Sequence, residues 1–485
     1  MHLLDRIDHW GRVAPRRAAH ISGGQVLTYG ELLARSEALA TWLQAELGEN
    51  RAPVAVSGHK EPEMLIGFLA AVKSGRPYIP IDVSIPAHRA EIIVQRAGAA
   101  LVLTPERIRE LAGDRREVPL RRVEAGDPFY ILFTSGSTGE PKGVVITLSN
   151  LHAFVDWMCT EQGFAEAGET FLNQAPFSFD LSVMDLYLSL GTGGTLFSIT
   201  REESAHLKQL YAAFARSALT TWVSTPSFAQ MCLIERGFTE AMIPSLRRFL
   251  FCGETLAPET AAQLLERFPQ AQVWNTYGPT EATVATTSIQ VDQALLKAHS
   301  PLPIGRQMPG SQVFICGEKG QTLRDGERGE IIIAGPNVSP GYLGRPDLTG
   351  KAFFHLESMG AYRTGDWGRE RNGLIFFEGR MDGQVKVNGY RIEIGDLESN
   401  LRALPEVADA VVLPVSRNGR VESLLAFVVT AVARSGSDLE FSSRLKTALG
   451  QRVPAYMIPR KFRFVDAFPM TPNGKADRRR LAEML

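Results

Sequence analysis

The feature of the sequence that most limits its fold is the alternation of short apolar runs with helical patterns before residue 383. Residues 53–56, 78–81 and 100–103 are short apolar runs typical of buried strands. Residues 63–73 and 89–97 between them have helical patterns. Strands that alternate with helices predict parallel sheets covered by helices.

Composition excludes several classes of protein. The chain has 485 residues, 52 Lys plus Arg, 53 Asp plus Glu and a net charge of −1, without the basic excess of a nucleic-acid binder. Its longest apolar run, 64–72, is too short to span a membrane. Acidic residues near the N-terminus argue against a secretory signal. The four cysteines are far apart, which favours a reducing compartment over a disulfide framework or zinc site. We therefore expect a cytoplasmic protein.

Charge divides the chain unevenly. Residues 383–485 contain 16 Lys or Arg and 11 Asp or Glu, whereas the preceding part has an acidic excess. The polar stretch 379–384, with two glycines, coincides with this change. We interpret it as a domain boundary where a few residues absorb large changes in φ and ψ. A plain hairpin turn fits the local pattern equally well.

The most informative segment is an apolar strand, 129–133, followed by the loop 134–143. The loop reads Thr-Ser-Gly-Ser-Thr-Gly-Glu-Pro-Lys-Gly. Its glycines allow close backbone approach, its hydroxyls donate hydrogen bonds and its lysine supplies charge, as phosphate binding requires. It is neither a Walker loop nor a Gly-x-Ser-x-Gly elbow. The alternative is a surface turn.

This loop resembles the phosphate loop of the adenylate-forming superfamily, which includes acyl-CoA synthetases, luciferases and adenylation domains of nonribosomal peptide synthesis. Segments resembling further motifs of that family follow in order: 275–281, 362–366, 379–382 with 386–391, and 472–475. We identify the chain as a member. The resemblance implies an α/β fold, with a large N-terminal domain of stacked α/β subdomains (1–381) and a small mobile C-terminal α+β domain (382–485).

The resemblance also implies an ATP site. Thr134, Ser135, Ser137, Thr138 and Lys142 would hold the β- and γ-phosphates, and Thr280 the α-phosphate. Tyr277 would stack on adenine, Asn275 would read its edge, Asp366 would accept ribose hydroxyls, and Arg380 would reach ribose or phosphate. Glu281 would hold Mg²⁺. The full implied set for ATP is Thr134, Ser135, Gly136, Ser137, Thr138, Gly139, Lys142, Asn275, Thr276, Tyr277, Gly278, Pro279, Thr280, Asp366, Arg380 and Lys475.

By the same resemblance Lys475 is the catalytic lysine. It would bridge the substrate carboxylate and the α-phosphate while the new bond forms. The C-terminal domain would then rotate about the hinge Asp382, so that the segment around Gly389 and Tyr390 faces a phosphopantetheine thiol. Without the resemblance, we would interpret Lys475 as a surface lysine that follows an Asn-Gly turn.

Asp180 indicates the class of substrate. It follows Phe-Ser-Phe, so its carboxylate would be partly buried and would need a cation. A substrate ammonium would supply one, whereas fatty and aryl acids would not. The alternative is an ion pair with a protein Lys or Arg.

Five segments carry a closer resemblance within the superfamily: 177–187, 224–228, 249–254, 275–285 and 470–475. They resemble those of ligases that load D-alanine onto a carrier protein. The amino-acid site implied is Asp180, Met184, Cys252, Val284 and Lys475. Further implied pocket positions are Leu181, Ser224, Leu250, Thr276 and Ala285. Cys252 is linked to stereochemistry by this resemblance, although a lone cysteine is more often simply core. One methylene is worth only about 1–3 kcal/mol, so we expect some leakage with Gly and Ser.

We therefore expect ATP-dependent formation of D-alanyl adenylate and transfer to the phosphopantetheine of a separate carrier protein, as in cell-envelope (lipoteichoic acid) D-alanylation. The carrier is expected in trans because the chain ends ten residues after Lys475. The main alternative is a stand-alone adenylating enzyme of secondary metabolism for L-alanine or another small amino acid. Two further alternatives are an acyl-CoA ligase and a nucleotide-binding protein without catalytic activity. Asp180 argues against the first, and the intact Glu281 and Lys475 argue against the second.

Overall fold

The structure, a computed structural model, describes residues 2–113, 115–136, 140–164, 168–387, 389–417, 420–431, 437–470 and 476–484. The chain forms two compact units. The first comprises Met1–Asp82, Ala97–Leu132 and Gly143–Met381. The second comprises Val83–Arg96, Phe133–Lys142 and Asp382–Leu485, so it includes two short segments that the sequence analysis assigns to the N-terminal domain.

The first unit is built on three sheets. The largest has the order β14 (Arg306–Gln307), β13 (Thr287–Val291), β12 (Gln272–Tyr277), β11 (Arg248–Phe251), β10 (Thr221–Ser224), β8 (Thr170–Asn173), β9 (Thr195–Ser198), β1 (Ala18–Ser22), β2 (Gln25–Thr28). The second has the order β17 (Gly341–Tyr342), β7 (Lys142–Thr147), β6 (Pro128–Thr134), β4 (Tyr78–Asp82), β3 (Val54–Gly58), β5 (Leu101–Leu103). The third contains β15 (Gln312–Cys316), β16 (Gly329–Ala334), β19 (Met359–Arg371), β18 (Phe353–Leu356) and β20 (Leu374–Arg380).

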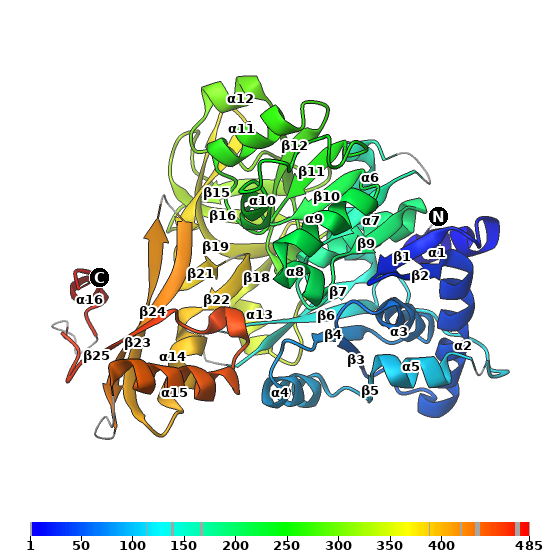
Figure 1. The fold of residues 1–485 in the computed structure, drawn as a ribbon, viewed down its shortest axis with the longest axis horizontal. Coiled ribbons are helices and arrows are strands. Elements are labelled where there is room, and N and C mark those ends of the chain that lie inside the picture. Colours follow the sequence, from blue (N-terminus) through cyan, green and yellow to red (C-terminus); the bar gives the residue numbers. More distant parts are fainter. Residues whose placement is uncertain are drawn as a thin grey trace. The chain divides into compact units, whose positions relative to one another are not determined.

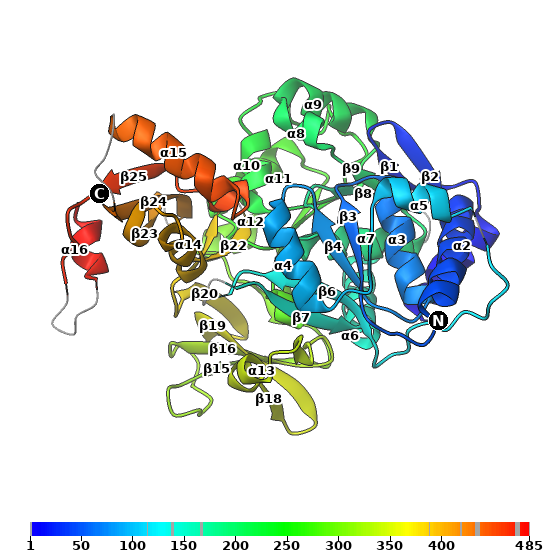
Figure 2. The same cartoon turned by 90° about the horizontal axis from the view of Figure 1, so that it is seen from below.

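Helices connect and cover these strands, as Figures 1 and 2 show. The helices of the first unit are α1 (Leu3–Val13), α2 (Tyr29–Leu47), α3 (Pro62–Lys73), α5 (Pro105–Leu111), α6 (Leu148–Gln162), α7 (Leu181–Thr192), α8 (Arg201–Ala205), α9 (Leu207–Arg216), α10 (Pro226–Cys232), α11 (Pro258–Arg267), η1 (Thr280–Ala282), α12 (Gln293–Ala298) and α13 (Pro346–Ala352). Within the described residues, no helix combines the length and apolar character needed to span a membrane.

The predicted parallel pairing holds at the centres of two sheets and fails in the third. The neighbours β8, β10, β11 and β12 pair in parallel, as do β3, β4 and β5. In the third sheet, the strand pairs among the described residues are all antiparallel. Its strands β19 and β20 are joined by Asn372 and Gly373, both with positive φ. Asn-Gly between strands is a strong hairpin signal, because short turns permit only antiparallel neighbours.

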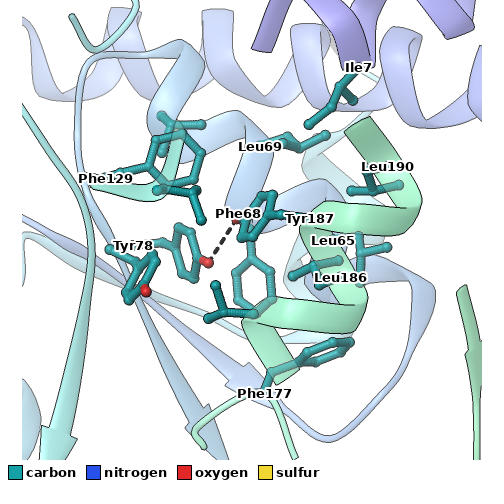
Figure 3. Close-up of a cluster of buried hydrophobic side chains, with 14 of the residues drawn as sticks. Ile7, Leu65, Phe68, Leu69, Tyr78, Phe129, Phe177, Leu186, Tyr187 and Leu190 are labelled. Atoms are coloured by element: carbon teal, nitrogen blue, oxygen red, sulfur yellow. Dashed lines mark hydrogen bonds between the residues drawn. The ribbon is translucent and has the colours of Figure 1, made fainter. Parts of the chain in front are cut away.

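A buried core joins α3 to α7, helices of the first unit that flank different sheets (Figure 3). Phe68 of α3 stacks on Tyr78 at 4.2 Å between ring centroids and meets Phe177 edge-on at 5.5 Å. The hydroxyls of Tyr78 and Tyr187 lie 2.8 Å apart, which satisfies two buried polar groups. Because α7 is buried along its whole length, this core fixes the position of its first residues.

The second unit has its own core. It contains the hairpin β21 (Gln384–Val387) and β22 (Tyr390–Glu393), and a sheet of β23 (Val407–Arg417), β24 (Arg420–Thr430) and β25 (Lys461–Phe464). Its helices are α4 (Ala87–Ala97), α14 (Ile394–Arg402), α15 (Asp438–Gly450), η2 (Ala455–Met457) and α16 (Arg478–Ala482). The Arg89 guanidinium forms a buried ion pair with the Asp396 carboxylate at 2.8 Å. This pair connects the short segment 83–96 to the rest of the unit.

Candidate active site

The start of helix α7 brings together two residues that are 100 positions apart in the sequence. The Thr280 hydroxyl donates a hydrogen bond of 2.6 Å to the Asp180 carboxylate. Asp180 is half-buried and immediately precedes α7, where the positive end of the helix dipole stabilises a negative charge. The residue expected to bind an ammonium therefore contacts the residue expected to bind the α-phosphate.

Apolar residues expected in the amino-acid pocket share one buried cluster. Leu181 and Met184 come from α7, and Leu250, Cys252, Val284 and Ala285 come from β11 and the segments after β11 and η1. The Cys252 thiol donates to the Val284 carbonyl at 3.4 Å. Ser224 and Thr276 are also buried, and their hydroxyls donate to the carbonyls of Thr225 and Phe251. Both hydroxyls are thus bonded to backbone oxygens.

The segment 280–286, which we call the pocket turn, has an unusual backbone. Thr283 and Val284 have φ values of 50° and 70°. β-Branched residues rarely adopt this left-handed region, and such strain costs roughly 1–3 kcal/mol per residue. Gly278 lies directly beneath the turn, since a Cβ at that position would come within 2.6 Å of the Ala285 Cα. The turn is therefore held in place by its surroundings.

Glu281 lies in the pocket turn with its side chain fully buried. One carboxylate oxygen accepts a hydrogen bond of 2.7 Å from the Tyr342 hydroxyl. No group of three or more metal-ligating side chains occurs among the described residues. A single carboxylate still fits Mg²⁺, which proteins commonly bind through one or two carboxylates together with substrate phosphates.

Asp366, expected to bind ribose, is held by two partners. Arg380 donates to Oδ1 at 2.7 Å, and the Tyr277 hydroxyl donates to Oδ2 at 2.5 Å. Each carboxylate oxygen can accept a second hydrogen bond, so these contacts orient Asp366 and are compatible with ribose binding. Burial, followed by the Asp366 charge, raises the pKa of Tyr277 well above its usual value, so this phenol remains a donor.

Tyr277→Phe should raise the KM for ATP about tenfold while hardly changing the amino-acid KM. The variant keeps the ring but loses a hydrogen bond to a charged group, a loss of about 1.5–3 kcal/mol. Steady-state kinetics with each substrate varied in turn checks this. Tyr211→Phe is the matched control, because that hydroxyl donates to the Cys232 backbone in a different core cluster. Equal ATP KM values for the Tyr277 variant and wild type would contradict the assignment.

Asn275 is buried within β12, and its amide nitrogen donates to the Pro303 carbonyl at 2.8 Å. The amide has a second N–H group and an oxygen, and both suit a contact with the adenine edge. Thr276, Tyr277, Gly278, Pro279 and Thr280 follow in the same strand-to-turn segment.

The described part of the phosphate loop lies in the second unit. The Thr134 hydroxyl is buried without a hydrogen-bond partner in the described structure, which fits a site for phosphate oxygens. Ser135 instead donates to the Arg391 carbonyl at 3.1 Å and accepts from the Glu393 amide at 3.2 Å. Gly136 is required sterically, because a Cβ there would approach the Glu140 carbonyl to 2.2 Å. Lys142 begins β7.

Four predicted residues lie outside the described residues: Ser137, Thr138, Gly139 and Lys475. Met470 and Ala476, on either side of 471–475, pair in an isolated antiparallel bridge. Asp382 is exposed between β20 and β21, and its carboxylate accepts from the Gln384 amide at 3.0 Å. Its role as a hinge remains a prediction.

One segment of the site, 336–342, was not predicted from the sequence; we call it the clamp segment. Asn337 and Tyr342 both donate to the pocket turn, through contacts with Ala282, Thr286 and Glu281. The available signal was Asn and Tyr within a Gly- and Pro-rich loop directly after a buried strand, since such loops carry function disproportionately.

Comparisons with known proteins agree across the whole chain. Residues 7–120 and 107–343 match the AMP-binding enzyme family, and residues 396–475 match the AMP-binding enzyme C-terminal domain. A D-alanine–D-alanyl carrier protein ligase of Bacillus velezensis is 47% identical over 100% of this chain and 99% of its own length. One of Bacillus licheniformis is 46% identical with the same coverage.

Solved structures match the fold. The Vibrio cholerae adenylation domain AlmE, in complex with glycyl-adenosine-5'-phosphate, has a TM-score of 0.83 at 23% identity, covering 99% of this chain and 98% of that one. An artificially fused adenylation–PCP di-domain from Klebsiella oxytoca has a TM-score of 0.83 at 25% identity, covering 95% and 93%. With these motifs, folds and full-length relatives in agreement, this chain belongs to the AMP-binding enzyme family.

Proposed function

We propose that this chain activates D-alanine with ATP and transfers the D-alanyl group to the phosphopantetheine thiol of a separate carrier protein. Full-length relatives named D-alanine–D-alanyl carrier protein ligase support the proposal. The single observation that carries it is the contact between Asp180 and Thr280. The ammonium and carboxylate of an α-amino acid are separated by one carbon, so their binding residues must be close neighbours.

The first half-reaction joins the substrate carboxylate to the α-phosphate. A carboxylate oxygen attacks the α-phosphorus, the bond to the β-phosphate oxygen breaks, and pyrophosphate leaves. Asp180 orients the ammonium and Thr280 contacts the α-phosphate. Lys475 stabilises the negative charge that develops between the reacting groups, which is the largest contribution expected from any one side chain.

ATP recognition is divided among the other predicted residues. Tyr277 and Asn275 receive adenine, Asp366 and Arg380 receive ribose, and Thr134, Ser135 and Lys142 with the rest of the phosphate loop receive the β- and γ-phosphates. Glu281 would hold Mg²⁺, which neutralises phosphate charge when it is bound. Tyr342 orients the Glu281 carboxylate through its hydroxyl.

The second half-reaction transfers the acyl group to sulfur. The carrier thiol gives up its proton to solvent, its sulfur attacks the acyl carbon, and the bond from that carbon to the AMP phosphate oxygen breaks, so that AMP leaves. We assign the change between half-reactions to rotation about Asp382, which replaces Lys475 by the segment around Gly389 and Tyr390. A few element-terminal residues can absorb such a domain movement.

The size of the pocket supports a small side chain. Met184, Cys252 and Val284 are each no more than 3% exposed and belong to one packed cluster. Larger side chains would have to displace close-packed atoms. An acyl-CoA ligase is disfavoured because its substrates offer no ammonium to Asp180. An enzyme for L-alanine or another small amino acid remains the alternative, since this packing limits size more directly than chirality.

Cys252→Ala should lower the preference for D-alanine over L-alanine by about tenfold. With the ammonium at Asp180 and the carboxylate at Lys475, the two methyl groups occupy different sides of the Cα. Removing the sulfur opens space of roughly one methyl group, and one such group is worth about 1–3 kcal/mol. The measurement is kcat/KM for each enantiomer in adenylation.

Cys232→Ala is the matched control for this prediction. Cys232 is also fully buried but lies in a different core cluster, so its replacement should destabilise the protein without changing enantiomer preference. A D-to-L ratio that changes equally in both variants would identify Cys252 as ordinary core.

The experiment that tests the proposed function is thioester formation on a purified carrier protein bearing phosphopantetheine. With ATP and D-alanine, intact mass spectrometry should detect D-alanyl carrier, whereas a carrier without phosphopantetheine should remain unmodified. Acetate with coenzyme A is the comparison for an acyl-CoA ligase. Formation of acetyl-CoA from acetate, without any D-alanyl carrier from D-alanine, would refute the proposal.

We also propose a cytoplasmic location. The reaction requires ATP, and the four cysteines, all within the described residues, form no disulfide, as expected in a reducing compartment.

A further inference from the structure

The clamp segment, residues 336–342, holds the pocket turn, residues 280–286, through backbone and side-chain bonds. The Ser339 amide donates to the Glu281 carbonyl at 2.9 Å. The Thr283 hydroxyl donates to the Asn337 carbonyl at 2.7 Å. Together with the Tyr342 bond to Glu281, these contacts attach the turn along most of its length.

The Asn337 side chain makes the most specific of these contacts. It is fully buried, and its amide nitrogen donates to the Ala282 carbonyl at 2.8 Å and to the Thr286 hydroxyl at 2.7 Å. Its amide oxygen lies 3.3 Å from the Ser311 hydroxyl, which donates to it. A primary amide has two N–H groups, so these two short bonds use both donors.

The two Asn337 bonds bracket the strained residues of the turn. Ala282 precedes and Thr286 follows the left-handed pair Thr283 and Val284. On the other side, the turn is held by the Cys252 thiol, a weak donor, at 3.4 Å from the Val284 carbonyl. The stronger restraint on the conformation of Val284 therefore comes from Asn337.

We propose that Asn337 is a positioning residue for substrate discrimination. By fixing the pocket turn in its left-handed conformation, it keeps Val284 beside Cys252, whose thiol donates to the Val284 carbonyl, and thereby sets the shape of the amino-acid pocket. This inference rests on the proposed function, because it assigns Val284 to the pocket wall. Asn337 is not among the residues assigned to either substrate and acts here through the wall of the amino-acid pocket. Its loss should therefore change selectivity for the amino acid more than recognition of ATP.

Asn337→Ala should lower the D-alanine to L-alanine ratio of kcat/KM by about tenfold and raise the D-alanine KM, with a much smaller change in the ATP KM. Asn150→Ala is the matched control. Asn150 is a buried asparagine whose amide nitrogen donates to the carbonyls of Pro336 and Val338, at 2.7 and 3.0 Å, on the same clamp segment. Asn150→Ala should lower the melting temperature but leave the D-alanine to L-alanine ratio of kcat/KM within about a factor of two of wild type.

A second variant keeps the test decisive if Asn337→Ala does not fold. Thr286→Val keeps the side-chain shape but removes the hydroxyl that accepts from Asn337, which leaves one Asn337 N–H group unsatisfied. It should therefore shift the ratio in the same direction by a smaller factor. An unchanged ratio in a folded Asn337 or Thr286 variant would overturn the inference, and so would an equal change in Asn150→Ala. Wild-type protein without D-alanine activity would instead refute the proposed function.

Discussion

Replacing Lys475 by alanine should slow adenylation of D-alanine by about 10²–10³ while leaving ATP affinity nearly unchanged. Loss of one well-placed donor that stabilises transition-state charge typically has this effect. Because the contact would strengthen as the bond to phosphorus forms, the loss should appear in kcat more than in KM. Single-turnover formation of D-alanyl adenylate, together with equilibrium binding of ATP, measures both quantities.

Lys461→Ala is the control for this variant. Lys461 is an exposed lysine on β25 in the same unit, so its replacement removes the same charge without touching the predicted site. The Lys475 variant should still load a carrier from D-alanyl adenylate prepared in advance, because the second half-reaction does not use this lysine. More than about a third of wild-type adenylation in the Lys475 variant would show that another group supplies the charge.

Asp180→Asn should raise the KM for D-alanine by about 30- to 100-fold and the KM for ATP far less. The substitution keeps the shape of the side chain but removes the charge that pairs with the substrate ammonium. Loss of such an ion pair at a half-buried position costs roughly 2–3 kcal/mol of binding free energy, which is at the low end of the range for buried ion pairs. The pairing exists in both ground and transition states, so binding should suffer more than kcat.

The same substitution five residues later provides a close control. Asp185 is fully buried on the same helix, and burial raises the pKa of its carboxyl well above the usual range. The Asn173 amide donates to this carboxyl at 3.0 Å. An asparagine can accept that bond, so Asp185→Asn should leave both KM values nearly unchanged. If both variants damage both KM values equally, the effect of Asp180 is structural.

Much of the candidate site could be predicted because its chemistry is carried by short local segments. The segment from Asn275 to Glu281 and the segment around Asp366 each contain residue types that suit nucleotide binding at fixed spacing. The sequence did not reveal which side chains restrain one another. The bonds from Tyr277 to Asp366 and from Thr280 to Asp180 join residues about 90 and 100 positions apart.

The fold was predictable where strands alternate with helices and less so elsewhere. In the third sheet, the hairpin at Asn372 and Gly373 required attention to turn chemistry rather than to apolar runs. The strained pair Thr283 and Val284 could not be predicted, because β-branched residues locally favour extended backbone. The turn that contains them is hydrogen-bonded by Asn337, which is more than fifty residues away and is brought to the turn only by folding.

The most direct test of the account is amino-acid-dependent exchange of pyrophosphate into ATP by the wild-type protein. The panel comprises D-alanine, L-alanine, glycine, serine and a β-amino acid. We expect the highest kcat/KM with D-alanine, measurable leakage with glycine and serine, and no exchange without an amino acid. A higher kcat/KM with L-alanine than with D-alanine, or no amino-acid-dependent exchange at all, would contradict the assignment of this chain as a D-alanine-activating ligase.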